Sequence, residues 1–171
     1  MKKQIQYLLV GYPFSGKTVL AKELEKRFGF LRLGIDAVKF DLGYKGISDS
    51  NISDTVWKRI FRELDRRITE YLKQGKTIVN EYAWLTKDWR NRARNLADKL
   101  GIETKIIFIN IPEKVVRERW KINRMTKERF DVPDDVFEEA IRLFEFPTPE
   151  ENILYYNDKD TIDIWIKKYI K

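Results

Sequence analysis

One short loop near the start of the chain has a spacing of residues that fits chemistry on phosphates. It matches the pattern G-x-x-x-x-G-K-[S/T], with Gly11, Gly16, Lys17 and Thr18 at the fixed positions. Glycines let such a loop curl so that several backbone N–H groups face one anion, and a following helix adds the positive end of its dipole. In this pattern the lysine reaches the β- and γ-phosphates of a nucleotide and the hydroxyl holds Mg²⁺. We therefore predict that the chain binds a nucleoside triphosphate.

The segments on either side of the loop suit this prediction. An apolar run at 5–10 predicts a buried strand, and the run at 17–28 predicts a helix that ends at Gly29. We expect most of the loop and the start of the helix to contact the nucleotide. The predicted nucleotide-binding residues are Gly11, Pro13, Phe14, Ser15, Gly16, Lys17, Thr18 and Val19.

Carboxylates are the candidates for proton transfer, because the chain contains neither histidine nor cysteine. Any general base must be a carboxylate or a lysine of lowered pKa, and metal sites built on imidazole or thiolate are excluded. Asp36 and Glu81 each follow a segment predicted to be a strand. A carboxylate at such a position can orient an acceptor hydroxyl during phosphoryl transfer. Two plainer interpretations stay open: Asp36 caps a helix that begins near Ala37, and Glu81 lies on the rim without a metal.

A basic segment at 114–129 holds seven lysines and arginines against two glutamates. Phosphoryl transfer requires cationic groups that close over the transferring group. Because the segment follows the predicted fourth strand, we interpret it as a lid at about 114–133. Each arginine taken alone could equally be a solvated surface charge.

The order of the predicted elements fixes the fold class. Strands are expected at 5–10, 30–35, 77–80, 104–111 and 153–156. Helices are expected at 17–28, 54–74, 86–100, from Pro112, at 134–144 and at 162–170, with 37–53 irregular. Alternating strands and helices predict a parallel sheet covered on both faces, with ligands at the carboxyl ends of the strands.

Length, charge and composition limit the number of domains, the kind of ligand and the location of the protein. The 171 residues suit one domain, 1–171, and the net charge of +7 suits a phosphate-rich ligand. No apolar run approaches the length of a membrane span, so we expect a cytoplasmic protein that does not engage a membrane.

Four motifs together resemble a known family. They are Gly11-x-Pro13-x-Ser15-Gly16-Lys17-Thr18, an aspartate after the second strand, Leu85-Thr86-Lys87-Asp88, and the run Phe144-Glu145-Phe146-Pro147-Thr148-Pro149-Glu150. This set resembles the P-loop kinases of the polynucleotide 5′-kinase type, whose relatives include the zeta-toxin and seryl-tRNA kinase-like proteins. The resemblance covers about 4–157. It implies a three-layer α/β/α kinase fold, a sheet of order 2-3-1-4-5, an arginine-bearing lid, and transfer from ATP with Mg²⁺ to a hydroxyl.

The resemblance also implies roles for single residues. Lys17 and Thr18 match the phosphate lysine and the magnesium hydroxyl, and Asp36 matches the aspartate that activates the acceptor. Lys39 lies where the polynucleotide kinases place an arginine on the acceptor phosphate, and Glu81 lies where an aspartate contacts Mg²⁺ through water. The candidate lid arginines are Arg119, Arg124 and Arg129.

Three departures from the family pattern are visible. Phe14 replaces a residue that is usually glycine or alanine, and Glu81 is one methylene longer than aspartate. Lys39 cannot make the bidentate phosphate contact of an arginine.

Three functions follow from these observations. The leading one is an ATP-dependent, polynucleotide-kinase-like phosphotransferase acting on a nucleic-acid 5′ end. The alternatives are a small-metabolite kinase on the same fold, and a binding module in which ATP orders the lid. A basic groove leading to Asp36 would favour nucleic acid, and a small closed pocket would favour a metabolite. Trp84 and Trp120 neighbour the predicted site and either stack on a base or belong to the core.

Overall fold

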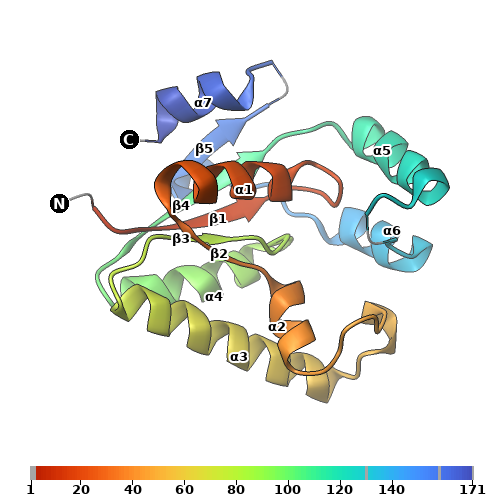
Figure 1. Cartoon of the computed structure of the whole chain (residues 1–171), viewed down its shortest axis with the longest axis horizontal. Helices are drawn as coiled ribbons and strands as arrows, with labels where there is room; N and C mark the ends of the chain where they lie inside the picture. The colour runs from red at the N-terminus through yellow and green to blue at the C-terminus, as the bar shows by residue number, and fades with distance from the viewer. Residues whose placement is uncertain (1–2, 130, 158, 171) are drawn as a thin grey trace.

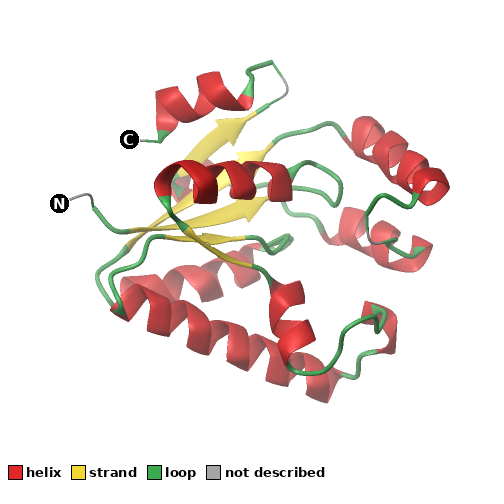
Figure 2. Ribbon diagram, in the orientation of Figure 1, coloured by secondary structure: helices red, strands yellow, loops and turns green. Residues whose placement is uncertain are grey.

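A five-stranded parallel sheet with helices on both faces forms the centre of the computed structural model (Figures 1 and 2). The structure describes residues 3–129, 131–157 and 159–170, so both ends of the predicted domain 1–171 lie outside the described residues. The strand order is β2-β3-β1-β4-β5, and each neighbouring pair is parallel. The predicted three-layer fold and its order 2-3-1-4-5 are confirmed.

The elements alternate along the chain, as expected. The strands are β1 Ile5–Val10, β2 Leu31–Leu33, β3 Ile78–Asn80, β4 Glu103–Ile109 and β5 Ile153–Tyr156. The helices are α1 Lys17–Phe28, α2 Ile35–Asp41, α3 Asp54–Lys73, α4 Lys87–Asp98, α5 Glu113–Thr126, α6 Asp134–Leu143 and α7 Ile162–Tyr169. Two 3₁₀ turns complete the set, η1 Asp49–Asn51 and η2 Pro149–Glu151.

Successive residues of β1 point to opposite faces of the sheet and enter separate cores. Leu8 and Val10 join a core with buried residues of α3 and α4. Tyr7 and Leu9 join the other core, which contains buried residues of α1 and α7. Figure 1 shows the two helix pairs on opposite sides of the sheet. Because both faces are buried, β1 is apolar at every position except the buried Gln6 and does not alternate between apolar and polar residues.

Side-chain caps fix the starts of α3 and α4. The Ser53 hydroxyl accepts a hydrogen bond from the Val56 N–H, and the Thr86 hydroxyl accepts one from the Trp89 N–H. Each bond satisfies an N–H group that has no partner within its helix.

The region after β2 differs from the expectation. The strand predicted at 30–35 is present as β2 but ends early, at Leu33. The stretch predicted to be irregular from 37 instead starts inside α2, which begins directly after Gly34. Ile35, Val38 and Lys39 are buried at helical spacing, so packing on α3 and the sheet outweighs the weak local signal of so short a helix. Asp36 therefore lies in the first turn of α2 and not at a strand end. Gly34 occupies the N-cap position, so the capping role considered for Asp36 is also wrong.

None of the helices in the described part of the chain is both long and apolar enough to cross a membrane.

Candidate active site

The loop between β1 and α1 has a backbone that requires glycine at its two fixed positions. Gly11 has φ +156°, and a Cβ there would lie 2.9 Å from the Ile109 carbonyl oxygen and 2.9 Å from Ser15 Oγ. Gly16 has φ +108° and forms the N-cap of α1. A side chain at either position would therefore strain the loop. The two glycines of the sequence pattern therefore stand where this backbone conformation requires glycine.

Phe14, the unusual residue of the loop, also adopts a left-handed conformation, with φ +62°. Such a conformation costs a residue with a side chain roughly 1–2 kcal/mol, which explains why glycine suits this position. The Phe14 ring packs 6.3 Å from the ring of Phe137 on α6, centroid to centroid. Phe137 in turn stacks on Trp120 of α5, with centroids 4.3 Å apart and planes 1° from parallel. Aromatic contacts thus join the loop to α6 and, through Phe137, to α5 of the predicted lid.

Lys17 is held inside the loop. Its Nζ donates hydrogen bonds to the carbonyl oxygens of Gly11, at 2.8 Å, and Tyr12, at 2.6 Å. Burial lowers its pKa to about 7, and the nearby Glu81 carboxylate partly opposes this shift. The buried Ser15 hydroxyl has no hydrogen-bond partner among the described residues. A partly buried lysine, an unsatisfied hydroxyl and a backbone curled around glycine fit a phosphate group.

A cavity of about 410 Å³ opens beside the loop, within the usual size range of small-ligand sites. The loop and α1 form one wall, α5 with the residues that follow it forms another, and the ends of β4 and β5 close it. The lining residues are Phe14, Ser15, Gly16, Val19, Ile111, Arg119, Ile122, Asn123, Thr126, Glu128, Arg129, Tyr156 and Ile162. Of the loop residues predicted to bind nucleotide, Phe14, Ser15, Gly16 and Val19 line this cavity.

The three predicted lid arginines have different surroundings. Arg119 donates to the Phe14 and Ser15 carbonyl oxygens at 3.2 and 3.3 Å, so it touches the loop directly. Arg129 lines the same cavity. Arg124 does not line it: its guanidinium lies 4.8 Å over the Trp120 ring and forms ion pairs with Asp131 and Asp134.

Glu81 directly follows β3, as predicted, and its N–H donates to the Leu33 carbonyl oxygen at 2.8 Å. Its side chain is 10% exposed and forms an ion pair with Arg32. Thr18 is exposed in the first turn of α1. No cluster of three or more acidic, histidine or cysteine residues that could hold a metal ion occurs in the described segments.

A second cavity, of about 360 Å³, contains Asp36 and Lys39. The Lys39 side chain is only 5% exposed, pairs with Asp49, and lies 5.6 Å over the Trp57 ring. Asp36 is an exposed residue, yet partial desolvation of its carboxyl raises the pKa, while Lys39 opposes the rise and Asp49 adds to it. Asp36 and Lys39 thus line one cavity, whereas Glu81, the third residue predicted to bind substrate, is not among its described lining residues.

Sequence reasoning missed several residues of this second cavity. Asp49, Ile47 and Val136 carry no recognisable pattern, because they come from a loop and from a helix far along the chain. The base-stacking role considered for Trp84 and Trp120 is wrong, since these side chains are only 3% and 7% exposed and belong to the two cores.

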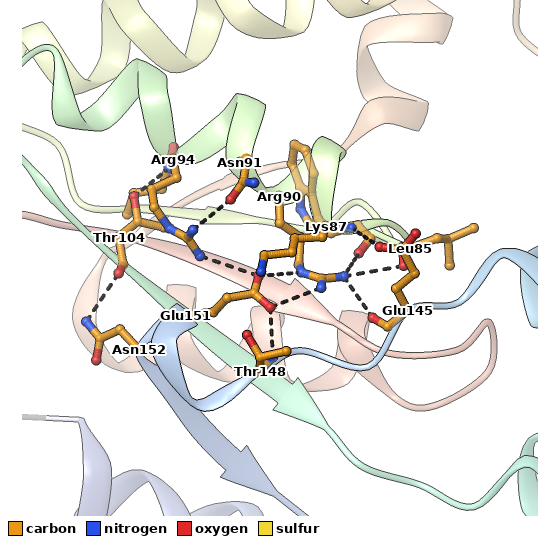
Figure 3. A network of polar contacts seen from close by, with 12 residues as sticks. Leu85, Lys87, Arg90, Asn91, Arg94, Thr104, Glu145, Thr148, Glu151 and Asn152 are labelled. Carbon is orange, nitrogen blue, oxygen red and sulfur yellow. Dashed lines mark hydrogen bonds and ion pairs between the residues drawn. The ribbon is translucent and has the colours of Figure 1, made fainter.

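Two of the later motifs meet in a buried polar network away from both cavities (Figure 3). Arg90 donates to both carboxylate oxygens of Glu151, at 2.8 and 3.1 Å, and to the carbonyl oxygens of Leu85 and Glu145. The Lys87 N–H donates to the Glu145 carboxylate at 2.7 Å. These motifs therefore join α4 to the segment before β5, and Arg90, their centre, was not anticipated from the sequence.

A family described as AAA domain matches residues 7–147, which is most of the chain. The chain belongs to this family. No curated protein gives a significant match.

Solved structures with the same fold are kinases by their descriptions. A candidate kinase from Chloroflexus aurantiacus is 18% identical with a TM-score of 0.72, covering 99% of this chain and 97% of that one. A sugar kinase from Janibacter is 17% identical with a TM-score of 0.68, covering 98% and 92%. The APS kinase of Mycobacterium tuberculosis, solved with AMPPNP and APS, is 16% identical with a TM-score of 0.66, covering 99% and 97%. At these identities the likeness establishes a P-loop kinase fold.

Proposed function

We propose that this chain is an ATP-dependent phosphotransferase that moves the γ-phosphoryl group to a hydroxyl of a small molecule. The observation that carries the proposal is the pair of cavities. One is lined by the phosphate-binding loop and Arg119, and the other holds a carboxylate, Asp36, beside Lys39. A transferase for two substrates needs two such sites at one edge of the sheet.

In the reaction, the acceptor oxygen forms a bond to the γ-phosphorus while the bond from that phosphorus to the β,γ-bridging oxygen breaks. The electron pair of the broken bond leaves with ADP, and the hydroxyl proton passes to Asp36. Lys17 holds the phosphates, and Arg119 and Arg129 stabilise the charge that develops on them. Mg²⁺ held through Thr18 and Glu81 would neutralise phosphate charge. The role predicted for Arg124 requires it to leave Asp131 and Asp134.

A small acceptor is better supported than a nucleic acid. A polynucleotide acceptor calls for a basic groove that leads to the catalytic carboxylate. Among the described residues that line the second cavity, Lys39 is the single cationic residue, and it already pairs with Asp49. The structural neighbours support the same choice, because they include a sugar kinase and an APS kinase. The comparisons do not confirm the relation to polynucleotide 5′-kinases.

A screen of acceptors with γ-labelled ATP tests this proposal. Sugars, nucleosides, small alcohols, oligonucleotides with a 5′ hydroxyl and tRNA are each incubated with the protein and Mg²⁺. Transfer to a small molecule is expected, and the Lys17→Ala variant should abolish it. Transfer to oligonucleotides alone would restore the polynucleotide-kinase-like reading. ATP binding with no transfer to any acceptor would favour the nucleotide-dependent binding module.

A further inference from the structure

The walls of the second cavity are mostly apolar. They come from α2 and the loop after it on one side, and from the start of α6 and the residues before it on the other. The apolar lining residues are Phe40, Ile47, Val132, Pro133 and Val136. Phe40 and Ile47 are 45% and 38% exposed, although both are large and apolar. A ligand that covers them with apolar surface would gain roughly 25 cal/mol for each Å² removed from water.

The charges of the cavity are unfavourable for an anion. Its charged lining residues are Asp36, Lys39 and Asp49, which sum to one negative charge. The Lys39 side chain is nearly buried and already paired with Asp49. An anionic acceptor would have to displace Asp49 or lie beside the Asp36 carboxylate. Either arrangement places like charges close together, which is unfavourable even in a cavity that stays partly open to solvent.

A highly hydroxylated acceptor also fits the cavity poorly. Each hydroxyl directed at the five apolar side chains would lose its bonds to water without gaining a partner. Only the region around Asp36, Lys39 and Asp49 offers polar partners among the described lining residues.

We infer that the acceptor is an alcohol without an anionic group, whose hydroxyl meets Asp36 and whose apolar body lies between Phe40 and Ile47 on one side and Val136 on the other. This inference rests on the proposed function, because it names the acceptor class of that same site. The cavity of about 360 Å³ has room for a molecule of drug-like size or smaller.

Binding of matched alcohols by ligand-observed NMR tests the inference without requiring turnover. The probes are benzyl alcohol, its anionic analogue 4-(hydroxymethyl)benzoate, and D-glucose, each titrated into protein saturated with AMPPNP and Mg²⁺. We expect benzyl alcohol to bind at least about tenfold more tightly than the benzoate, a factor equivalent to about 1.4 kcal/mol. Glucose should also bind more weakly. Equal or tighter binding of the benzoate or of glucose, or no binding of any probe, would overturn the inference.

Two variants test where benzyl alcohol binds and whether the charges of the cavity disfavour an anionic ligand. Val136→Asp adds a second carboxylate to an apolar wall and should remove benzyl alcohol binding while nucleotide affinity stays unchanged. Asp49→Asn releases Lys39 and should strengthen binding of 4-(hydroxymethyl)benzoate by about tenfold, with benzyl alcohol little affected. Benzyl alcohol binding that survives Val136→Asp would place the probe elsewhere and refute the assignment. Loss of phosphoryl transfer in the acceptor screen would instead count against the proposed function, so the two failures are distinguishable.

Discussion

Arg90 and Glu151 form a buried ion pair in which the guanidinium contacts both carboxylate oxygens, with side chains that are 0% and 2% exposed. The remaining Arg90 donors reach backbone carbonyls of two separate segments. Glu151 also accepts from the Thr148 N–H at 2.8 Å. Because every partner is satisfied, the pair holds the segment before β5 against α4 (Figure 3).

Removing one partner of this pair should destabilise the protein strongly. Arg90→Met removes the cation that contacts both Glu151 carboxylate oxygens and leaves the longer contact to Arg94, at 3.5 Å. Losses of about 3–5 kcal/mol are usual when a buried pair loses one partner. The double variant Arg90→Met/Glu151→Leu should lose less than the sum of the single variants. Urea unfolding followed by circular dichroism measures both effects. Arg66→Met, which breaks an exposed pair with Glu63, is the control and should not shift the midpoint measurably. A loss in the double variant equal to the sum of the two single losses would show that Arg90 and Glu151 do not stabilise the fold as a pair.

ATP affinity should depend on pH through Lys17. In the free protein the pKa of Lys17 is lowered to about 7, and phosphates bound beside the ammonium must raise it. Below about pH 7 the group is already charged in both states, so it adds no pH dependence. Above that pH the bound state holds more protons than the free state, so binding takes up a proton and affinity falls as the pH rises.

Calorimetry in buffers of different ionisation enthalpy measures this proton uptake. Lys17→Ala is the control, because it retains only the titration of ATP itself, and it should also bind ATP more weakly and abolish transfer. Identical proton uptake in both proteins at pH 8 would contradict the assignment.

Asp36→Asn should separate ATP binding from transfer. The change keeps the shape of the side chain but removes its charge and most of its basicity, so transfer should fall by about 10²–10⁴-fold. ATP affinity should be unchanged, because Asp36 lines the other cavity. Single-turnover transfer beside ATP titration makes the comparison. Asp41→Asn is a control on the same helix, where the carboxylate pairs with Arg67 and does not line the cavity. Near-normal transfer by Asp36→Asn would remove Asp36 from the chemistry.

The segment from α5 to the start of α6 should become more protected when nucleotide binds. Arg119 and Phe14 already connect it to the loop, and phosphates would add charge-assisted contacts to Arg119 and Arg129. Hydrogen exchange with and without AMPPNP and Mg²⁺ should show slower exchange in peptides covering 113–133. Peptides from α3 serve as the internal reference. Equal exchange in both states would identify a fixed surface helix.

The sequence predicted best where local signals are strong. Few backbone conformations are compatible with the sequence from Gly11 to Thr18, and the mostly apolar run of β1 is typical of a buried strand. The sequence did not predict α2, because its seven residues form barely two helical turns. That length is too short for a periodicity of apolar residues to be recognised. The sequence also failed to distinguish the lid arginines. Their surroundings depend on partners such as Asp134, which packing selects and the periodicity of α5 does not reveal.

The two cavities share no lining residue, although Val136 and Phe137 are neighbours on α6. Val136 lines the second cavity, while Phe137 packs on Phe14 of the loop between β1 and α1. Substitutions that reshape the acceptor walls can therefore accumulate without altering the residues that hold the nucleotide. The arrangement leaves acceptor choice free to diverge in descendants of this chain while their use of the phosphate donor is inherited intact.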